Sequence, residues 1–101
     1  MNPEAERALA LAAEHGQPMR WWWLSFVDPA LPAGGRFLGV VVVRAPGFAT
    51  AVQTAHALGI NPGGQVRGLV LATDKALPEE LHGTLLVDKH AIGVLSAWAQ
   101  S

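Results

Sequence analysis

The chain has 101 residues, of which half are hydrophobic and only 15% are charged, and its formal net charge is −1. This charge argues against a protein that binds duplex nucleic acid, because such proteins normally carry a strong excess of basic residues. The absence of cysteine excludes disulfides, thiolate nucleophiles and cysteine-based metal sites.

The length predicts a single domain over residues 1–101. Because so few side chains are charged, a monomer is expected to expose an apolar patch, and such patches usually mark interfaces. We therefore expect a homo-oligomer.

The N-terminal segment predicts a helix, because Asn2 can cap it, Pro3 suits its first position and Gly16 can end it. The same segment lacks the basic start and the long apolar run of a signal peptide. No stretch of the chain approaches the roughly 20 apolar residues that cross a bilayer. The sequence thus favours a cytoplasmic protein with no membrane partner.

Three strands are predicted, over residues 20–27, 37–44 and 65–73. The four valines at 40–43 do not alternate with polar residues, so the second strand is expected to be central and buried on both faces. A helix from about residue 46 to 58 joins the second and third strands, and such a βαβ crossover makes these two strands parallel. The first strand is expected to run antiparallel to the second.

The C-terminal third predicts one helical turn in "LPEELHG", a short edge strand in "TLLV" and a last helix that Asp88 caps. Leu95 and Trp98 are expected on the inner face of this helix. The predicted fold is therefore α+β: a small mixed sheet of three to four strands with a central valine-rich strand, one βαβ crossover and helices packed on it.

The segments "WWLSF", "RFLGV" and "LGINPGG" resemble a group of small uncharacterised proteins from actinobacterial and phage or prophage genomes. The resemblance covers roughly residues 20–70, and "HGTLLVDKHA" is similar to the usual ending of the group. It implies an accessory protein of a mobile element. Small proteins in such settings often inhibit host defences by binding a protein or a signalling nucleotide.

Three adjacent tryptophans open the first predicted strand, and neighbouring side chains on a strand point to opposite faces. Trp22 is expected to meet the core together with the other apolar residues of its face. Trp21 and Trp23 share the opposite face, about 7 Å apart. Either a terminal helix or a second subunit covers these two rings, or they flank a planar ligand.

Basic residues gather at one end of the predicted sheet. Antiparallel pairing brings Arg20 near Arg44, and the third strand delivers Thr73, Asp74 and Lys75 to the same end. The helix that begins near Gly47 also presents unpaired amide groups there. A small anionic, nucleotide-like ligand is predicted at this end, with Trp21 or Trp23 stacking on it; solvated basic residues at strand ends are the alternative.

A second candidate surface lies at the opposite end of the sheet, and it comprises Asp28, Arg36, Asn61, Gly63, Gly64 and Arg67. The glycines resemble a phosphate loop, but they follow the C-terminus of a helix, where the dipole repels anions. No Lys-Ser/Thr pair follows them, as a Walker loop requires. A type II turn at 61–64, with proline second and glycine third, explains the motif without a ligand.

The four histidines show no metal-ligand spacing, and Ser25 lies in no nucleophile-elbow motif. The sequence therefore predicts a binding module with no catalytic residues, no metal and no cofactor. Its partner is expected to be a small anionic ligand. The alternative is a protein-interaction module or inhibitor that uses an apolar tryptophan face and binds no small molecule.

Overall fold

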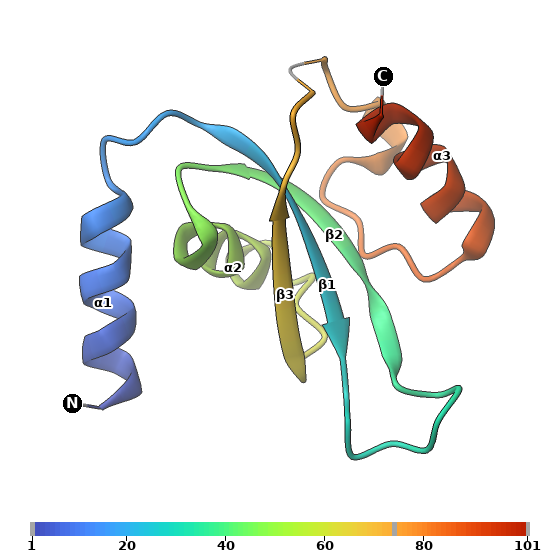
Figure 1. Cartoon of the computed structure of the whole chain (residues 1–101), viewed down its shortest axis with the longest axis horizontal. Helices are drawn as coiled ribbons and strands as arrows, with labels where there is room; N and C mark the ends of the chain where they lie inside the picture. The colour runs from blue at the N-terminus through green and yellow to red at the C-terminus, as the bar shows by residue number, and fades with distance from the viewer. Residues whose placement is uncertain (1, 74, 101) are drawn as a thin grey trace.

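A computed structural model describes residues 2–73 and 75–100, and Figure 1 shows an α+β arrangement of three helices and a three-stranded sheet. The elements in chain order are α1 (Pro3–Glu14), β1 (Arg20–Val27), β2 (Phe37–Ala45), α2 (Phe48–Ala57), β3 (Gln65–Val70), the 3-10 turn η1 (Glu79–Leu81) and α3 (Lys89–Ala99). The predicted α+β class is confirmed. The predicted helices and the first three predicted strands are present, although β3 ends at Val70 instead of at residue 73.

The strand order is β2-β1-β3, and β1 runs antiparallel to both neighbours. Strands β2 and β3 therefore point the same way, as the predicted crossover through α2 requires, but β1 lies between them. The prediction of a mixed sheet with the valine-rich strand at its centre is wrong in these two respects. The physical reason is that β3 pairs with the free edge of β1 rather than with β2.

The outer edge of β2 is closed by a single residue of the segment "TLLV". Val40 donates its N–H to the carbonyl of Leu86 at 2.9 Å, and Leu86 donates to the carbonyl of Val40 at 2.8 Å. The predicted fourth strand is thus reduced to one bridge. Helices on both faces of the sheet bury the four valines, so two-sided burial did not require a central position.

Alternation along β1 divides the core into two layers. Leu24 and Phe26 face α2, where they pack with Val41 and Ala51. Trp21 faces the other way and packs beneath α3 and η1; this second layer comprises Trp21, Val40, Val42, Leu77, Leu81, Leu86, Leu95 and Trp98. The predicted division of the tryptophan side chains between two faces is confirmed.

The helices begin where the sequence predicts. Asn2 caps α1 by accepting the N–H of Ala5 at 2.7 Å, and Asp88 caps α3 by accepting the N–H of Ala91 at 3.1 Å. Helix α3 buries Leu95, whereas no residue of α1 is fully buried. Within residues 2–73 and 75–100, no helix has both the length and the apolar character needed to span a bilayer.

Truncation of Leu24 tests the layer beneath α2. Leu24 is 0% exposed, so Leu24→Ala leaves a cavity and is expected to lower the free energy of unfolding by about 2–5 kcal/mol. Urea unfolding measures this loss. Leu9, which is 58% exposed on α1, is the control: Leu9→Ala is expected to change stability by less than about 0.5 kcal/mol. Equal effects of the two substitutions would contradict the assigned core.

Candidate functional site

A cavity of about 430 Å³ opens at the end of the sheet where β1 begins and β2 and β3 end. Its lining comprises Met19, Arg20, Trp21, Arg44, Val70, Leu71, Ala72 and Thr73. The register explains the assembly: Arg20 lies opposite Ala45, Trp21 lies opposite Arg44, and Leu71 donates its N–H to the carbonyl of Trp21 at 2.9 Å. Arg20 and Arg44 therefore reach one cavity, as the antiparallel pairing predicts.

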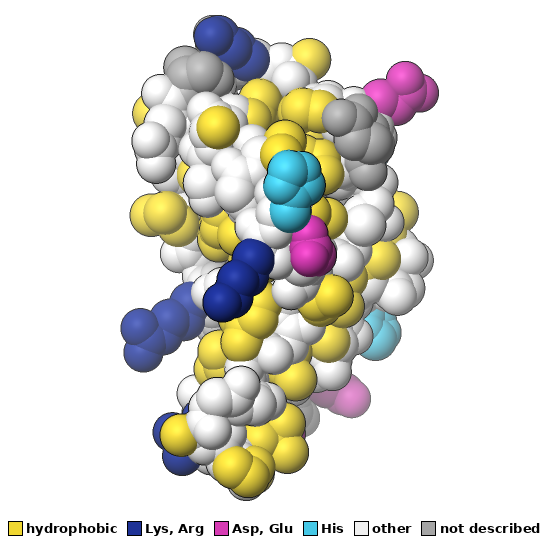
Figure 2. All heavy atoms as spheres, turned by 90° about the vertical axis from the view of Figure 1, so that its right-hand side faces the viewer, with side chains coloured by type: hydrophobic (Ala, Val, Ile, Leu, Met, Phe, Trp, Pro, Cys, Tyr) yellow, Lys and Arg dark blue, Asp and Glu magenta, His cyan; other side chains and the backbone are white. Residues whose placement is uncertain are grey.

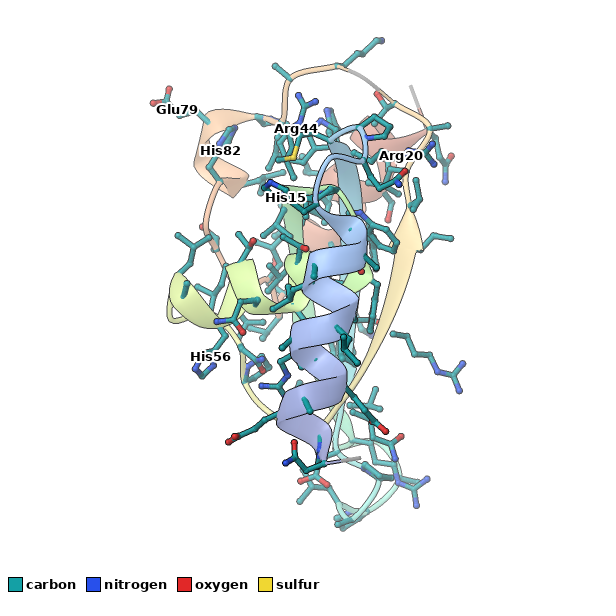
Figure 3. The ribbon with its side chains drawn as sticks, turned by 90° about the vertical axis from the view of Figure 1, so that its left-hand side faces the viewer. His15, Arg20, Arg44, His56, Glu79 and His82 are labelled. Carbon is teal, nitrogen blue, oxygen red and sulfur yellow. The ribbon has the colours of Figure 1, made fainter. Side chains whose placement is uncertain are left out.

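The two arginines approach the cavity from different faces of the sheet. Arg20 shares the α2 face with its partner Ala45, whereas Arg44 shares the α3 face with Trp21. Both residues are exposed and lie at the same end of the molecule (Figure 3). Asp74, which the predicted third strand also brings to this end, lies outside the described residues. Among the side chains that the structure describes, no carboxylate forms an ion pair with either arginine. This end thus carries two positive charges that the described chain does not neutralise.

Trp21 is enclosed by three side chains. The guanidinium carbon of Arg44 lies 5.5 Å from the ring centroid, a cation–π distance. The rings of Trp98 and His82 contact Trp21 edge-on, with centroids at 5.4 and 6.3 Å. The indole is only 8% exposed, so its place is in the core beneath α3. This packing does not favour the predicted stacking of Trp21 on a ligand.

The indole N–H of Trp21 is buried and has no hydrogen-bond acceptor in the described part of the chain. A buried donor without a partner costs about 1–3 kcal/mol. The ring lines the cavity that holds the arginines and a second one of about 300 Å³, which His82 also lines. The buried N–H group of Trp21, which lacks an acceptor among the described residues, therefore lies beside the candidate site.

Trp23 and Lys75, two further predicted site residues, lie outside the cavity. Trp23 lines a separate hollow of about 330 Å³ together with Leu69, Leu71 and the C-terminal end of α3. Lys75 is exposed, and its backbone N–H donates to the hydroxyl of Thr73 at 3.2 Å. Of the predicted ligand-binding residues, the structure thus brings Arg20, Trp21 and Arg44 together.

Gly47 caps α2, and the amides that follow it are already hydrogen-bonded. The carboxylate of Glu14, at the end of α1, accepts the N–H of Ala49 at 2.8 Å and the N–H of Thr50 at 2.7 Å. It also accepts the hydroxyl of Thr50 at 2.6 Å, and a Cβ at position 47 would collide with it. The anion predicted at this helix end is therefore supplied by the chain itself.

The surroundings of Glu14 lower the pKa of its carboxyl group. Burial raises the pKa, but the hydrogen bonds from Thr50 and Ala49 lower it more, so the net pKa lies below the ordinary value of 4.5. The carboxylate is thus held in its charged form, which is the form that the positive end of the α2 dipole favours.

The second candidate surface consists of turns that satisfy their own hydrogen bonds. Asp28 accepts the N–H of Ala30 at 3.0 Å, and Arg36 donates through Nε to the carbonyl of Leu31 at 2.8 Å. The side chain of Asn61 accepts the N–H of Gly63 at 2.8 Å.

The glycines of this surface have backbone reasons for their identity. Gly63 has a φ of 88°, the value that a type II turn needs at its third position, and Gly64 lies against the backbone of Val27. Arg67 is exposed on β3, opposite Ser25. These contacts account for the motif as a turn.

Sequence reasoning missed the apolar wall of the cavity and the role of Glu14. The sequence predicts a loop at Met19 and a strand at Val70 and Leu71, and nothing in the pattern indicates that these side chains line a cavity beside arginines. Glu14 lies 36 positions before Thr50, and no sequence pattern links a glutamate in one helix to the start of another.

The described histidines and carboxylates form no metal-binding cluster: among the side chains that the structure describes, no three His, Asp or Glu residues come close enough to hold a metal ion. His56 lies near the end of α2, away from Arg20 and Arg44 (Figure 3). Ser25 faces the α3 side of the sheet, so the sheet separates it from His56.

Comparison of the chain with protein-family models, with curated proteins and with solved structures gives no match. The site is therefore interpreted from its own geometry.

Neutralisation of Glu14 tests its role at α2. Glu14→Gln keeps the side-chain shape but removes the charge, and we expect a loss of about 0.5–1 kcal/mol in unfolding free energy at pH 7. Because the folded-state pKa is lowered, this stabilisation is complete above the ordinary pKa and disappears as the pH falls through the folded value. Chemical unfolding of both proteins between pH 7 and acidic pH measures it.

The control is the exposed Glu79, for which Glu79→Gln is expected to leave stability unchanged at every pH. If wild type remained more stable than Glu14→Gln by the same amount at acidic pH, the charge of Glu14 would not be the source of its stabilising effect.

Proposed function

We propose that the protein is a non-enzymatic binding module for a small anionic ligand, held in the cavity that Arg20 and Arg44 line. The observation that carries this proposal is the pair of arginines without a carboxylate partner among the described residues. A guanidinium group binds a carboxylate or phosphate through two parallel hydrogen bonds. Two such groups on one cavity favour an anion over a neutral or cationic ligand.

The remaining lining of the cavity supports a ligand with a polar head and an apolar body. Thr73 is buried, and its hydroxyl oxygen accepts the N–H of Lys75, which leaves the hydroxyl proton to be donated. Met19, Val70 and Leu71 supply apolar surface. The volume of about 430 Å³ lies in the range of roughly 300–1,000 Å³ that is usual for small-molecule sites.

A phosphate-bearing nucleotide is one ligand with these properties. Its phosphate would lie between the arginines, and its base would lie against the apolar wall instead of on the enclosed ring of Trp21. The resemblance to phage and prophage proteins implies binding of either a protein or a signalling nucleotide, and the second of these has a phosphate. Acetate and inorganic phosphate would bind the same arginines. A titration that compares them with nucleotides therefore distinguishes a nucleotide site from a general anion site.

A protein-interaction module is the second candidate, and exposed apolar side chains favour it. Met19 is 52% exposed and Leu69 is 62% exposed. On the side of α3, hydrophobic side chains reach the surface between scattered charged ones (Figure 2). Val87, which directly precedes the N-cap of α3, is 62% exposed. Such surface suits a partner protein better than a small polar ligand.

Calorimetric titration tests the anion site with inorganic phosphate, acetate, nucleoside monophosphates and cyclic nucleotides. We expect binding of at least one anion, and Arg44→Gln is expected to weaken it tenfold or more, because a hydrogen bond to a charged group contributes about 1.5–3 kcal/mol. Arg36→Gln, at the opposite end of the sheet, is the matched control and is expected to leave affinity unchanged.

Two results would overturn the anion site. One is the absence of heat for every anion in the series. The other is an equal loss of affinity in Arg36→Gln and Arg44→Gln, since this would report net charge and not the cavity.

A further inference from the structure

The outer edge of β2 is paired with the rest of the described chain at one residue. Leu86 bonds both the N–H and the C=O of Val40 at this edge. Successive residues of a strand direct their backbone groups to alternate sides, so the groups of Val42 and Arg44 also point outward. Strand β1 gives the same register, because Trp21, which lies opposite Arg44, directs its carbonyl away from β2.

The outward backbone groups beyond the bridge have no partner in the described chain. No hydrogen bond from the described residues reaches the outward N–H and C=O of Val42 or Arg44. Val42 is nevertheless only 5% exposed, and a buried backbone group without a partner costs free energy. The edge therefore offers two donors and two acceptors, on residues about 7 Å apart along the strand.

The segment that supplies Leu86 does not continue along this edge. An antiparallel continuation would place Thr84 opposite Val42. Instead, Gly83 has a φ of 58°, and the hydroxyl of Thr84 donates to the carbonyl of His82 at 3.0 Å. The segment thus turns back on itself at Gly83, and the edge of β2 beyond the bridge stays open.

A hollow of about 300 Å³ lies at this open edge, between the two layers that cover the sheet. Thr54 and Leu58 of α2 line it from one layer, and Leu77 and His82, which flank η1, line it from the other. Figure 3 shows His82 at the end of the molecule where Arg44 lies. Because side chains alternate along a strand, an added strand would direct one side chain toward Leu58 and the next toward Leu77.

We infer that the outer edge of β2 binds an extended, apolar segment of a partner protein, which adds a strand beside Val42 and Arg44. The backbone groups favour an extended chain, because such a chain presents donors and acceptors at the spacing of alternate residues. The leucines of both layers favour apolar side chains. The chain itself contains a segment of this type, because Leu86, which already pairs with the edge, lies in the run "TLLV".

Nuclear magnetic resonance of the ¹⁵N-labelled full chain tests this pairing with the acetylated and amidated peptide "TLLV". We expect the amide protons of Val42 and Arg44 to shift downfield and to saturate, because they gain hydrogen bonds. The amides of Val41 and Val43, which face β1, are the internal controls and are expected to shift much less. Saturating shifts at Val40 with none at Val42 would show that the peptide only replaces the existing bridge, and would overturn the inference.

Two N-methylated forms of the peptide separate strand pairing from apolar contact alone. In a paired strand, alternate amides face the neighbouring strand. A methyl group on one leucine nitrogen therefore blocks a hydrogen bond to β2, whereas a methyl group on the other leucine nitrogen points away from it. We expect one methylated peptide to bind at least tenfold more weakly than the other. Equal affinities of the two would contradict the added strand.

Leu58→Lys tests the apolar wall that α2 supplies. Leu58 is 55% exposed, and a lysine suits the C-terminal end of a helix, so we expect thermal unfolding to be unchanged. The peptide is expected to bind this variant at least fivefold more weakly. Leu69→Lys is the matched control, at a residue of β3 that is 62% exposed, and it is expected to leave the affinity unchanged. Equal weakening by both substitutions would place the peptide elsewhere and refute the site.

A small ligand in the same hollow gives a different result. If inorganic phosphate or a nucleoside monophosphate shifts the amides of Val42 and Arg44 and the peptide does not, the hollow is a small-molecule site and the inference is wrong. The pairing does not rest on the proposed anion site, which uses the side chains of Arg20 and Arg44. Peptide binding without binding of any anion would therefore refute the proposed function and leave the added strand supported.

Discussion

The two-sided hydrogen bonding of β1 is the constraint on which the rest of the structure depends. Because β1 is paired on both edges, its side chains have only the two faces of the sheet to occupy. Alternation then assigns Leu24 and Phe26 to α2 and Trp21 to α3. The three consecutive tryptophans are therefore not one aromatic surface. They are divided between two packed layers, and the ring of Trp21 is enclosed by contacts from α3, β2 and the turn that holds His82.

The same strand pairing determines where the charged side chains near the start of β1 lie. At the end where β1 begins, the carboxylate of Glu14 is bound by the amides of Ala49 and Thr50, so the positive end of α2 is already neutralised. Arg20 and Arg44 reach the neighbouring cavity without such a partner in the described chain. A free anion therefore has a reason to bind beside the arginines and little reason to bind at the helix.

The sequence predicts most of this arrangement, and what it misses depends on contacts between distant segments. Local sequence signals predict the caps at Asn2 and Asp88 and the glycine turn at 61–64. The predicted antiparallel pairing of neighbouring strands brings Arg20 near Arg44. The order of strands does not, because the valine run of β2 indicates burial on both faces but not which neighbours supply it. The environment of Trp21 likewise depends on α3, which the strand pattern does not reveal. Sequence reasoning left open whether a terminal helix, a subunit or a ligand covers the ring, and the C-terminal helix is what covers it.

Nuclear magnetic resonance of the ¹⁵N-labelled protein during a phosphate titration tests most directly whether the strand register creates the anion site. We expect the Nε–H of Arg44, the indole N–H of Trp21 and the amides of residues 71–73 to shift together and to saturate. The amides of Ala49 and Thr50, bonded to Glu14, are expected to stay unchanged. Shifts confined to those two amides, with Arg44 unaffected, would show that phosphate displaces Glu14 at the helix, and the cavity would then not be the binding site.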